Sequence, residues 1–99
     1  MDKELVNHPD HYNVPGKREC IVAMQEDYGD AITAVFCLTN AYKYLYRAGL
    51  KEGSSKDQDI AKAVWYYNYA VNNTVINNSD PGLDKLLSYL TDNLSKEDN

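Results

Sequence analysis

The spacing of apolar residues along the chain predicts four helices and no strand. Side chains three and four positions apart share one face of a helix. A first helix over about 17–28 has Ile21, Met24 and Tyr28 on such a face. A last helix over about 83–94 has a clean leucine stripe, formed by Leu83, Leu86, Leu87, Leu90 and Leu94.

Two longer helices are predicted between these. One spans about 30–49, with Asp30 as its N-cap, and its apolar side consists of Val35, Leu38, Tyr42, Leu45 and Gly49. The other spans about 57–74, and its apolar stripe consists of Ile60, Val64, Tyr67 and Val71. We expect both stripes to be buried.

Residues 1–16 form an irregular arm, because Pro9, Pro15 and Gly16 interrupt any regular element. Apolar side chains within the arm can pack against the rest of the protein, so we expect the arm to be structured. The chain is therefore predicted to be one all-α domain over 1–99, made of the arm 1–16, a three-helix core 17–74 and a C-terminal helix 82–95, assembled into a homo-oligomer. The leucine stripe either folds back on its own core or packs on a neighbouring subunit, and the pattern leaves both arrangements open.

Length and charge exclude several classes of function. Ninety-nine residues leave room for one domain with a modest core. The formal net charge of −5 disfavours a duplex-DNA binder, which normally carries a basic excess. No apolar run approaches the roughly 20 residues that span a bilayer, and the first residues lack an apolar signal segment. These features predict a cytoplasmic protein without a membrane partner, in which Cys20 and Cys37 are buried thiols.

A basic stripe is predicted on the polar side of the second helix. Asn40, Lys43, Tyr44 and Arg47 share that side, Lys51 follows in the next loop, and no acid lies between Asp30 and Glu52. A guanidinium and ammonium groups one turn apart can hold a phosphate. The alternative is a solvated basic face that pairs with acids of another helix.

Aromatic and acidic side chains accompany the third helix. Lys62, Trp65, Tyr66 and Tyr69 lie off its apolar stripe, so the rings either stack a nucleobase, form a subunit interface or belong to a wide buried face. Asp59 lies in the first turn, where an acid also favours the helix dipole.

The arm carries the two histidines, His8 and His11, around Asp10. Such a pair can shuttle protons, but it is too small a set to complete a metal site, so no metal is expected. The chain also lacks the Gly-rich loop of P-loop enzymes.

Taken together, these segments resemble a small tailed-phage family of unknown function that is often labelled SaV-like. The resemblance covers about residues 6–70. It rests on Val6-Asn7-His8-Pro9-Asp10-His11-Tyr12-Asn13, Glu19-Cys20-Ile21, Phe36-Cys37-Leu38, Asn40, Lys43-Tyr44-Leu45, Arg47-Ala48-Gly49, Lys51, Asp59, Lys62-Ala63 and Trp65-Tyr66. A related domain occurs in a coliphage nucleoside-monophosphate kinase that has no P-loop.

The resemblance implies a phage or prophage origin, an all-α fold and a role in nucleotide handling in the cytoplasm of an infected or lysogenic bacterial host. The matching residues are His8, His11, Tyr12, Asn40, Lys43, Tyr44, Arg47, Lys51, Asp59, Lys62 and Trp65. In this hypothesis Lys43, Arg47 and Lys51 hold phosphates, and Trp65 or Tyr66 stacks the base. His11 and Asp59 are the candidate catalytic groups, and magnesium would accompany the nucleotide.

Whether the protein turns a nucleotide over is left open by the sequence. A first alternative is non-catalytic sequestration of a nucleotide signal in anti-defence. A second is inhibition of a host protein by surface contact, in which case the basic stripe is incidental.

Overall fold

The computed structural model describes residues 18–50, 53, 55–77 and 79–94. These residues form the helices α2 (Cys20–Tyr28), α3 (Asp30–Arg47), α4 (Lys56–Asn73) and α5 (Pro81–Leu94), and no strand occurs among them. The predicted all-α fold with four helices is confirmed, with helix bounds within three residues of those expected. The predicted arm lies outside the described residues.

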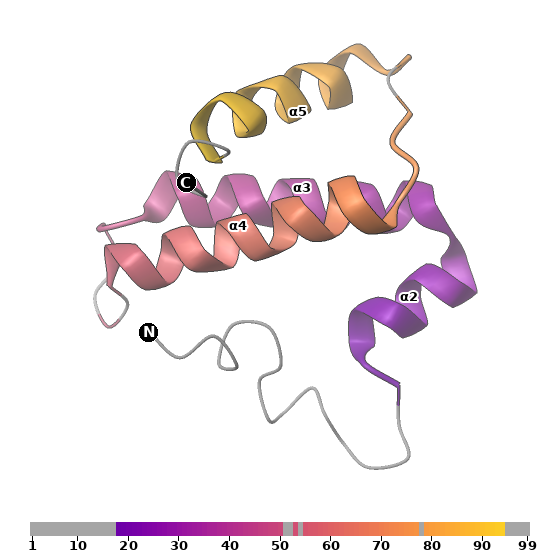
Figure 1. The fold of residues 1–99 in the computed structure, drawn as a ribbon, viewed down its shortest axis with the longest axis horizontal. Coiled ribbons are helices and arrows are strands. Elements are labelled where there is room, and N and C mark those ends of the chain that lie inside the picture. Colours follow the sequence, from indigo (N-terminus) through magenta and orange to yellow (C-terminus); the bar gives the residue numbers. More distant parts are fainter. Residues whose placement is uncertain (1–17, 51–52, 54, 78, 95–99) are drawn as a thin grey trace.

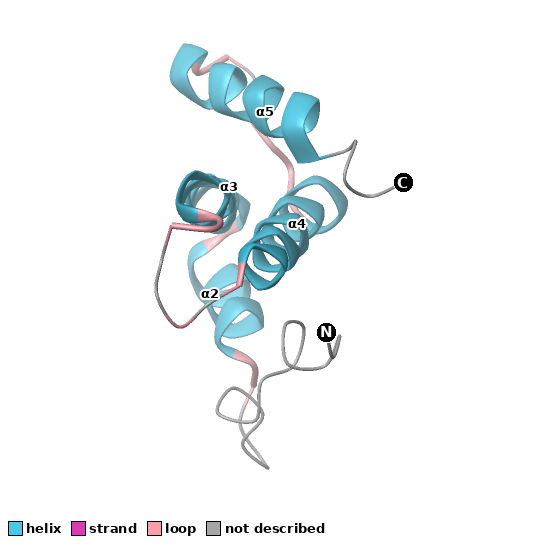
Figure 2. Ribbon diagram, turned by 90° about the vertical axis from the view of Figure 1, so that its left-hand side faces the viewer, coloured by secondary structure: helices cyan, strands magenta, loops and turns pink. Residues whose placement is uncertain are grey.

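Helices α3 and α4 form an antiparallel hairpin, and the other two helices flank it (Figure 1). Helix α5 lies along one side of this pair, while α2 lies at the other side, near the start of α3 (Figure 2). The turn between α3 and α4 therefore brings the C-terminal end of α3 beside the N-terminal end of α4. No helix in the described ranges is both long and apolar enough to cross a membrane.

Local sequence signals explain where the helices begin and end. Gly29, with φ of 97°, separates α2 from α3, and it occupies the N-cap position that was predicted for Asp30. Ser55 begins α4 through a capping box: its hydroxyl accepts the N–H of Gln58, whose side chain accepts the N–H of Ser55. Asp30 instead joins two elements, because its carboxylate accepts Gln25 Nε2 at 3.0 Å and the Val75 N–H at 2.8 Å. These hydrogen bonds, the one from Gln25 first, lower the pKa of Asp30.

The buried face of α3 differs from the predicted stripe. It consists of small or medium residues, namely Thr33, Ala34, Cys37, Leu38 and Ala41. Val35 and Tyr42, which were expected in the core, are exposed at 46% and 43%. Small side chains make up most of this face, which lets neighbouring helices approach closely, and Leu38 is the one residue of the predicted stripe that is fully buried.

The buried face of α4 is also shifted from its prediction. Its fully buried residues are Asp59, Ala63 and Ala70, whereas Val71 is exposed. Ile60, Val64 and Tyr67 are only partly buried. Both helices thus bury alanines and leave several bulkier side chains partly or largely exposed.

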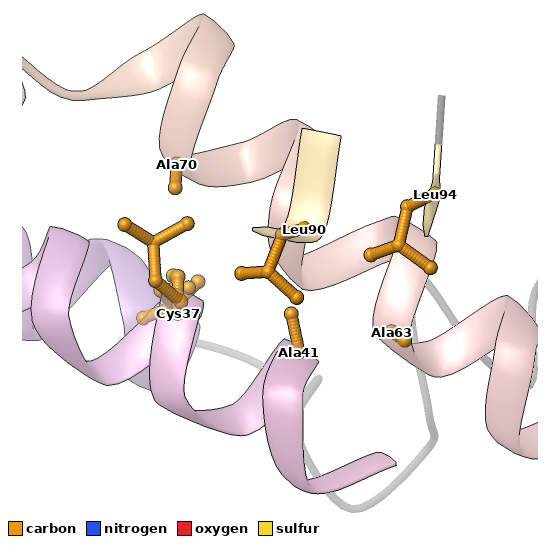
Figure 3. Close-up of a cluster of buried hydrophobic side chains, with 8 residues drawn as sticks. Cys37, Ala41, Ala63, Ala70, Leu90 and Leu94 are labelled. Atoms are coloured by element: carbon orange, nitrogen blue, oxygen red, sulfur yellow. The ribbon is translucent and has the colours of Figure 1, made fainter. Parts of the chain in front are cut away.

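Helix α5 packs on its own chain. Leu90 and Leu94 are fully buried in one cluster with Cys37, Ala41 and Ala63 (Figure 3). The leucine stripe therefore folds back on the hairpin, which decides between the two arrangements that the sequence left open.

The two cysteines have opposite environments, and the prediction that both are buried is wrong for Cys20, which is exposed. Burial raises the pKa of the Cys37 thiol from 9.0 to about 12.

We expect an aromatic disulfide reagent at neutral pH to titrate Cys20 in the folded protein and Cys37 only after unfolding. Because the unfolded chain ionises more readily, the free energy of unfolding should fall as pH rises from about 9 to 12 and should fall less in Cys37→Ala. Equal labelling rates for the two thiols would contradict the burial.

Candidate functional site

Three cationic side chains converge on the ring of Tyr44. Lys43 Nζ lies 4.5 Å from the ring centroid, Arg47 Cζ lies 4.8 Å from it, and Lys62 Nζ lies 5.4 Å from it. Lys43 and Arg47 come from the last turns of α3, and Lys62 comes from the second turn of α4. The hairpin therefore gathers charges from two helices around one aromatic ring, each within the range of a cation–π interaction.

Further rings lie beside Tyr44. Tyr66 of α4 stacks on Tyr44 with centroids 5.9 Å apart and planes 9° apart. Phe36 and Trp65 each make a T-shaped contact with Tyr66, at centroid distances of 5.8 Å and 5.1 Å. Trp65 in turn stacks on Tyr69 at 5.6 Å. The cations thus lie at one end of a continuous aromatic cluster that runs along α4.

An acid is buried next to this cluster. Asp59 has no exposed surface, and its Oδ1 lies 3.7 Å from Arg47 Nε. Within the described ranges, neither carboxylate oxygen of Asp59 accepts a hydrogen bond, and Arg47 Nε donates none. Buried polar atoms normally form hydrogen bonds. In this pair, the opposite charges instead attract each other across a distance longer than a hydrogen bond.

The balance of charge at the cluster is positive. The described part of the chain places no carboxylate within 4.0 Å of Lys43 or Lys62, whereas the surface Arg18 pairs with both Glu26 and Asp27. Like charges gathered around one aromatic ring repel one another, and an anion bound among them would relieve that repulsion. No group of three or more potential metal ligands occurs in the described ranges.

Five of the sequence-predicted site residues come together here: Lys43, Tyr44, Arg47, Asp59 and Lys62. Trp65 joins them only through Tyr66. Asn40 donates its side-chain N–H to the carbonyl of Phe36 at 2.8 Å, which is a bond within α3. His8, His11, Tyr12 and Lys51 lie outside the described residues.

Two features of the site differ from the sequence interpretation or were missed by it. Phe36 was not proposed as part of the aromatic cluster; its position four residues before Asn40 on the same side of α3 was the available signal. Asp59 was proposed as a candidate catalytic group, and no signal in the sequence indicated that its carboxylate is fully buried beside Arg47.

Comparison with known proteins identifies a family and no closer relative. Residues 6–68, more than half of the chain, match the model of the DUF3310 family, whose function is unknown. No curated protein and no solved structure matches the chain. The matched range includes every residue of the cation cluster and excludes α5.

Proposed function

We propose that this chain, which belongs to the DUF3310 family, binds the phosphate groups of a nucleotide at the cation cluster of Lys43, Arg47 and Lys62. The observation that carries the proposal is the convergence of these three charges within 5.4 Å of the Tyr44 ring centroid. In the described part of the chain, the fully buried carboxylate of Asp59 is the only one within 4.0 Å of any of these cations, and it pairs with Arg47.

The geometry favours a phosphate over a carboxylate ligand. Arg47 directs Nε toward Asp59, which leaves its two terminal nitrogens as a fork for a pair of phosphate oxygens. Lys43 and Lys62 approach the Tyr44 ring from different helices and act as point charges on the remaining oxygens. A doubly charged group with three terminal oxygens satisfies all three cations at once, whereas a carboxylate has only two oxygens to share.

The aromatic cluster supports a nucleotide over inorganic phosphate. Trp65 is partly exposed, and only the ring of Tyr66 separates it from Tyr44. A base stacked on Trp65 would therefore lie beside phosphates held at the cluster. Base-on-aromatic stacking contributes about 1–3 kcal/mol per base.

Phosphoryl transfer is the second candidate function, and the resemblance to a phage kinase domain motivates it. Three cations around a phosphate would neutralise charge on a transferring phosphoryl group, with magnesium accompanying the nucleotide. Because Asp59 is buried, its role in this proposal is to position Arg47 rather than to accept a substrate proton. The same resemblance leads us to propose a phage or prophage origin and action in the bacterial cytoplasm.

Thermal-shift screening tests the proposal. The panel holds nucleoside mono-, di- and triphosphates and cyclic dinucleotides, each with and without magnesium. A ligand at 100 times its Kd adds about 2.7 kcal/mol to the free energy of unfolding, which is about 10 °C or more for a domain of this size. We expect Lys43→Ala and Lys62→Ala each to weaken binding by about 10-fold or more, since hydrogen bonds to charged groups contribute about 1.5–3 kcal/mol.

Lys85→Ala is the matched control, because it removes the same charge from the exposed surface of α5. Equal weakening by all three variants would show a net-charge effect and would reject the site. A panel without any shift from a folded protein would reject nucleotide binding and leave a host protein as the partner. A shift without product formation on incubation would identify sequestration, and product formation would identify an enzyme.

A further inference from the structure

The side of α3 that faces away from α4 is exposed and apolar. Ile32, Val35, Tyr42 and Tyr46 are exposed at 54%, 46%, 43% and 71%. In Figure 2, α5 and α2 flank α3, and the described helices leave the side away from α4 uncovered except at its edge, where the Tyr42 ring meets Tyr89 of α5 with centroids 5.7 Å apart. Among the exposed positions of α3, the only charged side chain is Lys43. Large apolar side chains gathered on one helix face are typical of a surface that binds another protein.

The spacing of this surface matches a second helix with the same sequence. The positions 32, 35, 39, 42 and 46 are separated alternately by three and four residues, which is the seam of a two-helix coiled coil. Ile32 and Tyr46 lie at equal distances on either side of Thr39, and Val35 and Tyr42 nearly so. The spacing of the seam is therefore almost the same in either direction, and a two-fold axis at Thr39 places the aliphatic end of one copy against the aromatic end of the other.

We propose that a second copy of this chain docks on α3, with the two α3 helices antiparallel and Thr39 facing Thr39 at the two-fold axis. Ile32 of each copy then packs against Tyr46 of the other. Val35 of each copy packs against Tyr42 of the other.

Electrostatics favour the antiparallel orientation. A parallel pair would align the two helix dipoles side by side, whereas the antiparallel pair opposes them. Burial of Thr39 is tolerated, because its hydroxyl already donates to the carbonyls of Val35 and Phe36 within α3. Antiparallel docking therefore does not leave the Thr39 hydroxyl buried without a hydrogen bond.

The size of the surface indicates the strength of the dimer. The exposed parts of Ile32, Val35, Tyr42 and Tyr46 amount to on the order of 400 Å² per copy, which puts the dimer among small, weak interfaces. We therefore expect a dimer with a Kd in the micromolar range, about −8 kcal/mol, rather than an obligate assembly.

Sedimentation equilibrium of the full chain over a concentration series from about 1 to 300 µM tests the proposal. We expect a monomer–dimer equilibrium that Ile32→Glu and Tyr46→Glu each shift toward monomer by at least 10-fold in Kd. Val75→Glu is the matched control, because Val75 is 77% exposed and lies outside α3. Circular dichroism confirms that each variant is folded.

Cross-linking tests the orientation in a Cys20→Ser background, in which Cys37 is buried. Ile32→Cys and Tyr46→Cys should each remain uncross-linked alone and form a disulfide dimer when mixed. Self-cross-linking of each variant alone would show a parallel pair and overturn the antiparallel proposal. A chain that stays monomeric throughout the series, or a dimer that both glutamate variants leave intact, would overturn the interface.

Discussion

Arg47→Met is expected to lower the free energy of unfolding by about 3 kcal/mol, near the lower end of the 3–5 kcal/mol found when one partner of a buried ion pair is removed. Asp59 is fully buried, and Arg47 Nε at 3.7 Å is its one ion-pair partner in the described ranges. Methionine keeps the length and the apolar contacts of the arginine stem but leaves the carboxylate without a counter-charge. The lower end applies because the Arg47 side chain is 28% exposed, so water screens part of the interaction.

A second substitution, Asp59→Asn, should restore part of the stability that Arg47→Met loses. Adding Asp59→Asn to Arg47→Met removes the buried charge while keeping the volume, so the double variant should recover more than half of the lost stability. Urea unfolding monitored by circular dichroism measures the three free energies, and the coupling between the two positions follows from the double-mutant cycle. Additive losses would show that Arg47 stabilises the fold by packing rather than by charge.

Arg18→Met is the control for losing an arginine. Its guanidinium pairs with Glu26 at 2.7 Å and with Asp27 at 3.1 Å, but these pairs lie on the surface. Exposed ion pairs contribute about 0–1 kcal/mol, so the loss should be far smaller than for Arg47. Similar losses in the two variants would contradict the importance of the buried acid.

The ion pair of Arg47 with Asp59 determines which variants report on ligand binding alone. A change at Arg47 alters both the proposed phosphate site and the stability of the hairpin, so a lost thermal shift in Arg47→Met would have two explanations. Lys43 and Lys62 are at least partly exposed and have no carboxylate within 4.0 Å in the described part of the chain. Their variants therefore separate ligand binding from folding.

The sequence predicts where the helices lie better than which faces they bury. The apolar period, Gly29 and Ser55 locate α3 and α4 closely, because these signals are local. The buried faces were predicted only in part: Leu38 is buried as expected, but a hydrophobic pattern also gives weight to large residues such as Val35 and Tyr42, which are exposed. The buried faces of α3 and α4 instead contain several alanines, and only the packed structure shows that these small residues lie in the core.

The candidate site was likewise predictable only where the sequence signals are local. Helical spacing alone places Lys43, Tyr44 and Arg47 together on α3. The approach of Lys62 and Asp59 depends on the register of α4 against α3, which no local signal specifies. The burial of Asp59 was the least predictable feature, since an acid in the first turn of a helix is ordinarily exposed and favours the helix dipole.

Leu90→Ala is expected to lower the free energy of unfolding by about 3–5 kcal/mol, within the range for leucine deletions in cores. Leu90 is fully buried and lies against the alanine-lined side of the hairpin, in the cluster with Ala41, Ala63 and Ala70 (Figure 3). Alanine side chains have no rotamers with which to fill the space that a leucine vacates. The cavity should therefore persist, and the loss should lie in the upper part of the range.

Leu83→Ala deletes the same atoms at the start of α5, where the side chain is only partly buried, and should cost about 1–2 kcal/mol. Urea unfolding at two protein concentrations, in a Tyr46→Glu background to suppress association through α3, distinguishes packing within one chain from packing between chains. If the leucine stripe packs within its own chain, the loss from Leu90→Ala is the same at both concentrations and appears in a single transition. A loss that shrinks as concentration rises would mean that α5 packs on a neighbouring subunit, which would contradict the position of Leu90 in the hairpin core.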